Sequence, residues 1–180
     1  MNYNKYFLVG MPASGKSTIG KLLAGQIGLK FIDLDAIIVE NEGMDITEIF
    51  KSKGEDYFRE VERKYLQAQI SSSGSFVMST GGGAPCFFDN MVRMNEAGIT
   101  IFLDISLDDL YGKLLKKGTQ KRPLLKDISH ADLYKELEAK LTYRKAYYEK
   151  SNICLSQNLG NIYDRVNEVV NAIEVLKEET

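Results

Sequence analysis

The most constraining feature of this sequence is a glycine-rich string, GMPASGKS, at residues 10–17. It matches the pattern GxxxxGK[ST] and stands in the context that this pattern requires, directly after an apolar run and directly before an amphipathic helical pattern. Glycines allow the backbone to turn tightly, so that successive N–H groups point inward. Together with the positive end of the following helix, such a loop holds a polyphosphate. The string therefore predicts a strand, a phosphate-binding loop and a helix in succession.

The side chains of this loop indicate how it would hold a nucleotide. The Lys16 ammonium can reach the β- and γ-phosphate oxygens, and the Ser17 hydroxyl can ligate Mg²⁺. The residues expected to bind the nucleotide are Gly10, Ala13, Ser14, Gly15, Lys16, Ser17 and Thr18. A plain strand–turn–helix without a ligand is the alternative. The motif does not specify the reaction, because switches, motors and kinases share it.

Apolar runs alternate with helical patterns along the whole chain. The runs expected to be strands are Lys5–Val9, Leu29–Asp33, Phe76–Ser79, Ile99–Leu103 and Ile153–Leu155. The segments expected to be helices are Ser17–Gln26, Ile46–Ser52, Glu55–Ser72, Asp89–Glu96, residues 106–116, Ala131–Lys150 and Asn161–Lys177. Short apolar strands separated by helices predict a parallel sheet with both faces covered. A chain of 180 residues fits one domain, residues 1–180.

Composition excludes several classes of protein. Lys+Arg number 23 against Asp+Glu 25, so no global basic field favours nucleic-acid binding. The single histidine, His130, excludes a two-histidine metal site. Cys86 and Cys154 form no CxxC pair, and we expect buried or half-buried free thiols. No apolar run approaches the roughly 18 residues of a membrane span, and no signal-peptide pattern opens the chain, so we expect a cytoplasmic protein.

Two acidic residues stand at the end of the second expected strand, in the string FIDLD at 31–35. The strand period of two puts Asp33 and Asp35 on the same side, beside the phosphate loop. Two carboxylates there can divide their roles, one near Mg²⁺ and the other bonded to an acceptor hydroxyl. For Asp35 alone the alternative is the N-cap of a helix at Ala36–Glu42, an explanation that does not extend to Asp33.

Two arginines stand out in the helical patterns. Arg144 interrupts an apolar stripe of the helix Ala131–Lys150, and a guanidinium there needs an anionic partner. A substrate carboxylate would suit its planar fork, and a structural Asp or Glu is the alternative. Arg59 lies in FREVE at 58–62, where Glu62 could orient it. Taken alone, Arg59 is more often a surface ion pair than a ligand-binding residue.

Two loops complete the candidate regions. TGGGA at residues 80–84 follows an apolar strand, and its three glycines would let a ligand ring lie against bare backbone, unless the turn is merely flexible. Residues 116–129 lack periodicity, and their charged part, Lys116–Lys126, is a candidate lid, with a solvated surface loop as the alternative that charge alone favours.

Together these residues resemble the shikimate kinase family, over nearly the whole chain from Lys5 to about Asn171. The strings that carry the resemblance are GMPASGKS at 10–17, FIDLD at 31–35, FREVE at 58–62, STGGGAP at 79–85, KRPLL at 121–125 and YRKAYY at 143–148. The phosphate loop is shared by a very large superfamily, whereas the FxDxD, FRxxE and GGG elements in this order are much more specific.

The resemblance implies an α/β, three-layer P-loop NTPase fold of the nucleoside-monophosphate-kinase type, with a five-stranded parallel sheet flanked by helices. It implies a substrate-binding helical region at about 34–71 and a lid at about 116–128. It also implies Mg²⁺-dependent transfer of the γ-phosphate of ATP to the 3-hydroxyl of shikimate, in the biosynthesis of aromatic amino acids.

The family's site residues can be placed on this sequence. The resemblance implies that Lys16, Asp35 and Arg122 are catalytic, and that Arg122 also contacts the nucleotide. It implies that Ser17 and Asp33 serve the metal, the latter through water. The residues implied to hold shikimate are Asp35, Arg59, Gly81, Gly82, Gly83 and Arg144.

Two rival functions remain open at this stage. Another small-molecule kinase, such as a gluconate kinase, shares the phosphate loop and an acidic strand end, and the GGG and FRxxE elements argue against it. A non-catalytic ATP-binding module is the other rival. We expect a monomer whose partners are ATP, ADP and shikimate, with no nucleic acid and no membrane.

Overall fold

A computed structural model describes residues 4–117, 130–156 and 161–178. Within these ranges the apolar runs form five strands, β1 to β5, as the sequence predicts. Their bounds are β1 Lys5–Val9, β2 Lys30–Asp33, β3 Phe76–Ser79, β4 Ile99–Leu103 and β5 Ile153–Leu155. All four pairings are parallel and the order is β2-β3-β1-β4-β5. The expected parallel sheet is confirmed, with the strand that precedes the phosphate loop at its centre.

The helices follow the expected segments closely. Their bounds are α1 Lys16–Gln26, α2 Leu34–Glu42, α3 Ile46–Ser71, α4 Asn90–Ala97, α5 Leu107–Lys117, α6 His130–Tyr148 and α7 Ile162–Glu178, with a 3₁₀ turn, η1, at Ala84–Cys86. The expected lid, about 116–128, lies outside the described residues apart from its first two positions, which end α5. None of the described helices combines the length and the apolar character that a membrane crossing needs.

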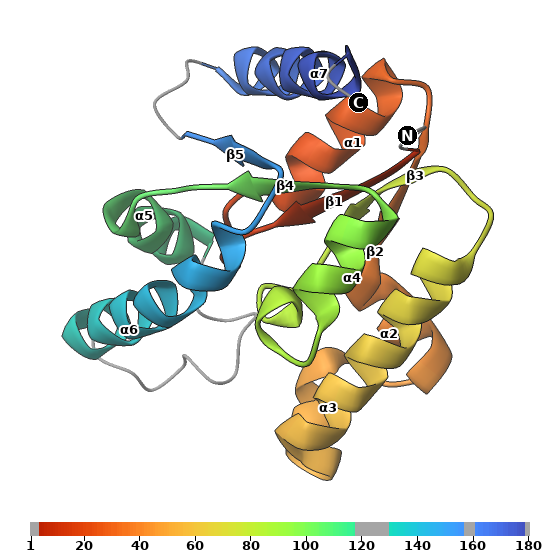
Figure 1. Cartoon of the computed structure of the whole chain (residues 1–180). Helices are drawn as coiled ribbons and strands as arrows, with labels where there is room; N and C mark the ends of the chain where they lie inside the picture. Colours follow the sequence, from red (N-terminus) through yellow and green to blue (C-terminus); the bar gives the residue numbers. More distant parts are fainter. Residues whose placement is uncertain (1–3, 118–129, 157–160, 179–180) are drawn as a thin grey trace.

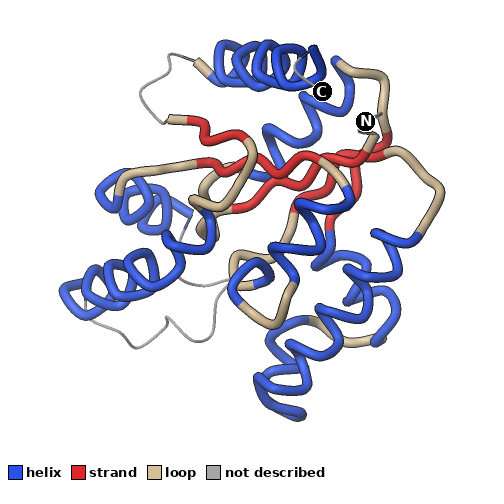
Figure 2. The backbone as a smooth tube through the Cα atoms, viewed as in Figure 1, coloured by secondary structure: helices blue, strands red, loops and turns tan. Residues whose placement is uncertain are grey.

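Helices cover both faces of the sheet and make three layers (Figure 1). Alternate residues of β1 show why: Tyr6 and Leu8 belong to the apolar cluster that packs against α1 and α7, whereas Phe7 and Val9 belong to the cluster that packs against α2 to α6. The strand period of two therefore divides one apolar run between two cores. Figure 2 shows the strands running together through the middle of the molecule.

The third helix is kinked where the sequence predicts a break between two helices. Gly54 has φ 84° and ψ 173° and interrupts the helical geometry of α3. Such a positive φ is readily available to glycine. The Asp45 side chain accepts a hydrogen bond from the Glu48 amide at 2.8 Å and so caps the start of α3.

The start of α2 corrects one expectation. The strand ends at Asp33, so the spacing of Asp33 and Asp35 is not that of an extended strand. Asp33, and not Asp35, is the N-cap, because its side chain accepts a hydrogen bond from the Asp35 amide at 3.1 Å. Asp35 lies in the first helical turn. A sharp strand-to-helix junction therefore brings the two carboxylates together.

The two cysteines are both free, as expected, but they differ in exposure. Cys86 is buried, whereas Cys154 is exposed and so departs from the expected burial. The alternation of β5 explains this, because Ile153 and Leu155 on either side of Cys154 are the residues that face the core.

Two glycines of α1 should respond oppositely to alanine. A Cβ at Gly20 would lie 2.6 Å from the Phe31 ring and 2.7 Å from Leu8, whereas a Cβ at Gly25 would meet nothing within 4 Å. We expect Gly20→Ala to destabilise the protein by about 1–3 kcal/mol through overpacking. Gly25→Ala is the matched control and should stabilise it by up to about 1 kcal/mol, because alanine favours the helix. Urea unfolding measures both, and equal changes would contradict the packing of α1.

Candidate active site

The phosphate loop lies between β1 and α1, in the conformation that its glycines predict. Gly10 and Gly15 have φ of 137° and 103°, and Ala13 also has a positive φ, 68°. A Cβ at Gly10 would lie 3.0 Å from the Leu103 carbonyl oxygen, so β4 also requires glycine there. The Ser14 side chain is fully buried, and its Oγ has no hydrogen-bond partner among the described residues. An unpaired polar atom within the loop fits a ligand that brings oxygen atoms.

Lys16 is held inside its own loop. Its Nζ donates hydrogen bonds to the carbonyl oxygens of Gly10 at 2.8 Å and Met11 at 2.9 Å, and the side chain is buried. The ammonium is therefore already at the loop, where these carbonyls hold its charge.

Side chains at the ends of three elements meet beside the loop. The Ser17 Oγ, at the start of α1, donates to Asp33 Oδ2 at 2.9 Å and lies 3.3 Å from the Ser79 Oγ. The parallel register explains the meeting, because Asp33 of β2 is paired with Ser79 of β3. Ser79 is not among the site residues expected from the sequence. Its position at the carboxyl end of a strand beside β1 is the signal that could have found it.

These residues line a cavity of about 460 Å³. Lys16 and Ser17 form part of its wall, and Asp33 and Asp35 form another part. The start of α3 contributes Ile46 and Thr47. No sequence motif marks these two residues, because they reach the cavity only through the way α2 turns back onto α3.

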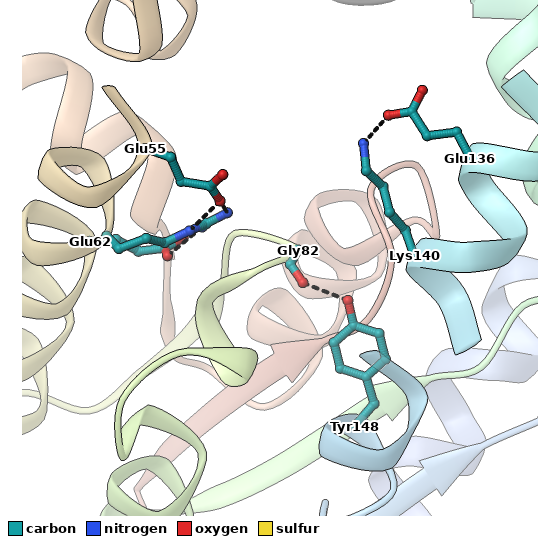
Figure 3. A network of polar contacts seen from close by, with 7 residues as sticks. Glu55, Glu62, Gly82, Glu136, Lys140 and Tyr148 are labelled. Carbon is teal, nitrogen blue, oxygen red and sulfur yellow. Dashed lines mark hydrogen bonds and ion pairs between the residues drawn. The ribbon is translucent and has the colours of Figure 1, made fainter. Parts of the chain in front are cut away.

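Arg59 is buried, which the sequence alone did not favour. Its Nη1 donates to Glu62 Oε2 at 2.8 Å, and its Nε and Nη2 donate to Glu55 Oε1 at 3.2 Å and 2.9 Å (Figure 3). Glu62 therefore orients the guanidinium as expected, and Glu55 is a second partner that the sequence analysis missed. Since Glu55 precedes Arg59 by four residues in a helix, the spacing could have indicated it.

Aromatic rings surround the same guanidinium. Its Cζ lies 4.1 Å from the centre of the Phe87 ring and 5.1 Å from that of Phe58, with Phe50 at 5.9 Å. A planar cation over a ring face gains electrostatic stabilisation. The rings therefore fix the plane of Arg59 while leaving its edges to hydrogen bonds.

Contacts within the protein, and not only room for a ligand, explain the three glycines after β3. A Cβ at Gly81 would lie 2.4 Å from Glu62 Oε1, one at Gly82 would lie 2.7 Å from Pro12, and one at Gly83 would lie 2.6 Å from Arg59 Nη1. As they lie in this structure, these side chains leave no room for a Cβ at any of the three positions. The loop is also held rather than merely flexible, because the Tyr148 hydroxyl donates to the Gly82 carbonyl at 2.5 Å (Figure 3).

Arg144 is half-buried in α6, on the face that carries Leu137, Leu141 and Tyr148. Within the described ranges no carboxylate lies at ion-pair distance from it, so no structural Asp or Glu partner of the kind considered above is found there. Its positive charge opposes the rise in the pKa values of Glu62, Cys86 and Tyr148. Arg144 therefore lies near the Arg59–Glu62 pair. Arg122, the remaining expected site residue, lies outside the described residues.

Burial raises the pKa values of three groups near Arg59, namely Glu62, Cys86 and Tyr148. It raises the pKa of the Glu62 carboxyl from an ordinary 4.5 to about 7, and the adjacent Arg59 charge offsets only part of the rise. Burial likewise raises the pKa of the Cys86 thiol to about 11 and raises that of the Tyr148 hydroxyl. The Cys86 thiol is therefore protonated and inert at neutral pH.

Sequence comparisons with known proteins point to one family. The family model described as shikimate kinase matches residues 12–174. A shikimate kinase of a Sulfurihydrogenibium species is 39% identical over 93% of this chain and 96% of its own length.

Solved structures agree with the sequence matches. The crystal structure of shikimate kinase from Bacteroides thetaiotaomicron has a TM-score of 0.87 and 34% identity, covering 94% of this chain and 98% of that one. Shikimate kinase from Acinetobacter baumannii in complex with shikimate also has a TM-score of 0.87, with 28% identity over 98% and 96% of the two chains.

The raised pKa of Glu62 predicts a pH dependence of stability. Between pH 4.5 and about 7 the folded chain holds a proton on Glu62 that the unfolded chain has lost, so stability falls as pH rises through this window. The difference in unfolding free energy between wild type and Glu62→Gln should fall by up to about 3 kcal/mol from pH 4 to pH 8. Urea unfolding at several pH values measures it. Both proteins share all other titratable groups, so subtracting the two free energies removes the contributions of those groups. A difference that does not change with pH would contradict a buried Glu62 carboxyl with a raised pKa.

Proposed function

Since the chain belongs to the shikimate kinase family, we propose that it transfers the γ-phosphate of ATP to the 3-hydroxyl of shikimate, giving shikimate 3-phosphate and ADP. The observation that carries this proposal is the cavity lined by both the phosphate loop and Asp35. Gly82 of the glycine loop also lines it, and the buried Arg59 lies against Gly83 of the same loop. A phosphoryl donor and a carboxylate-bearing acceptor would meet there.

The nucleotide half of the proposal rests on the loop. Its N–H groups and the start of α1 would hold the phosphates, and the buried, unpaired Ser14 Oγ fits that use. Lys16 would exchange a carbonyl partner for the β- and γ-phosphate oxygens and offset their charge during transfer. Arg122 would contribute a second positive charge.

A magnesium ion would complete this half. The Ser17 hydroxyl would ligate it directly and Asp33 through water, and these two groups already lie 2.9 Å apart. The donors are oxygen atoms, and Mg²⁺ typically takes few protein ligands beside phosphates and water. When bound, the ion supplies charge neutralisation to the transferring phosphoryl group.

The acceptor half of the proposal rests on Arg59 and Arg144. Their guanidinium groups would clamp the carboxylate of shikimate, and the backbone of Gly81, Gly82 and Gly83 would lie against its ring. Arg59 is held in place by Glu62 and Phe87, so little order would have to be gained on binding. Residues 34–71, which hold α2 and α3, would be the substrate-binding region of one kinase domain.

The proposed chemistry is a direct in-line transfer without a phosphoenzyme. The described site supplies charge and position, and the transition state of phosphoryl transfer asks mainly for these. Asp35 would orient the acceptor hydroxyl and accept its proton. The proposal needs no residue from a second chain, so a monomer would be sufficient as the active form.

The direct test is release of ADP from Mg-ATP with and without shikimate. We expect turnover that requires shikimate, and no comparable turnover with gluconate or other hydroxy acids at the same concentration. Turnover with gluconate but not with shikimate would favour another small-molecule kinase. Tight ATP binding without ADP release on any acceptor would favour a non-catalytic module.

The role of Asp35 can be tested separately. We expect Asp35→Asn to lower kcat by about 100-fold or more, as for loss of a general base. Glu40→Gln, an exposed change in the same helix, is the matched control and should leave kcat unaltered. Calorimetry shows whether the variant still binds shikimate; normal binding with near-normal turnover would eliminate the base role.

A further inference from the structure

The hydrogen bonds of Arg59 differ at its two edges. A guanidinium has five N–H donors in a planar fork, and two edges can each bind a carboxylate with two bonds. The Nη1–Nη2 end lies beside buried Glu62 and against Gly83, where even a Cβ would come within 2.7 Å of both nitrogens. The Nε–Nη2 edge is occupied by a single oxygen of Glu55. The edge open to a ligand is therefore the one that Glu55 holds.

The two glutamates also differ in their freedom to leave. The Glu62 side chain is 0% exposed, so it has no water to move into. The Glu55 side chain is 54% exposed. Water can solvate an exposed carboxylate once it leaves its partner, so the release of Glu55 costs less than the release of the buried Glu62 would. Glu55 is therefore the exchangeable partner of Arg59.

The backbone at Glu55 favours this exchange. Glu55 directly follows the kink at Gly54 and begins the second section of α3. A carboxylate at the start of a helical section is stabilised by the helix dipole, so Glu55 has a favourable electrostatic environment besides its pair with Arg59. Rotation of the side chain alone is enough to vacate the edge of Arg59.

We propose that Glu55 is a displaceable internal carboxylate, which occupies the ligand edge of Arg59 until the carboxylate of the acceptor substrate replaces it. Its presence keeps a buried guanidinium paired in the empty site and lowers the apparent affinity for the acceptor. This inference rests on the proposed function, since it assumes an acceptor that carries a carboxylate.

An orienting role for Glu55 is the competing explanation. Glu62, Gly83 and Phe87 already fix the position and plane of the guanidinium from three directions. Loss of Glu55 should therefore free an edge without releasing Arg59. The two explanations predict opposite changes in affinity.

The test compares Glu55→Gln with Glu60→Gln. Both substitutions remove one negative charge from an exposed residue of the same helix, and Glu60 makes no ion pair within the described residues. We expect the Kd of shikimate, measured by calorimetry, and its KM to fall about two- to fivefold in Glu55→Gln, the range of an ion pair with an exposed partner. The Kd of ADP should not change, and Glu60→Gln should match wild type throughout.

Three results separate the possibilities. An unchanged shikimate Kd in Glu55→Gln, or an equal fall in Glu60→Gln, would overturn the exchange. A raised Kd would overturn it in favour of an orienting role. If wild type itself neither binds nor phosphorylates shikimate, the proposed function fails, whereas normal wild-type turnover with an unaltered variant rejects this inference alone.

Discussion

The buried pair of Arg59 and Glu62 is the constraint on which the site depends. Neither side chain is more than 8% exposed, so water cannot replace a lost partner, and removal of Arg59 would leave the Glu62 carboxyl buried without its cation. The pair also shapes its surroundings. It lies so close to the loop after β3 that a Cβ at Gly81 or Gly83 would displace one of the pair, and three aromatic rings lie around the guanidinium. A buried guanidinium that has one edge on an exchangeable partner is suited to bind an anion.

The parallel sheet brings the second half of the site to the same place. Its central strand ends in the phosphate loop, and the neighbouring strands end at Ser79 and Asp33, so one edge of the sheet gathers the phosphate, hydroxyl and carboxylate groups. The glycine loop joins the halves, because Gly82 lies against Pro12 of the phosphate loop and accepts a hydrogen bond from Tyr148 of α6. Donor and acceptor positions are thus linked through Gly82, which contacts the Pro12 ring on one side and the buried Tyr148 side chain on the other.

Local patterns in the sequence were sufficient for the strands, most helix bounds and the phosphate loop, because each depends on neighbouring residues. They were insufficient where distant segments meet. Asp33 was not expected to cap α2, since the junction there depends on where the sheet ends. The glycines at 81–83 looked like room for a ligand, whereas contacts from α3 and the phosphate loop require them. The burial of Arg59, and the difference between Glu55 and Glu62, follow from how α3 packs and not from their spacing in the helix.

The central claim is that the buried charge of Arg59 is held for the carboxylate of the acceptor. Calorimetric affinities of the wild-type protein for shikimate and for its uncharged carboxamide, equal in shape, test it most directly. Loss of a charge-assisted pair predicts that the carboxamide binds about 10- to 100-fold more weakly. Equal affinities for the two compounds would show that the Arg59 guanidinium does not bind the negative charge of the carboxylate, and would contradict the account of this site.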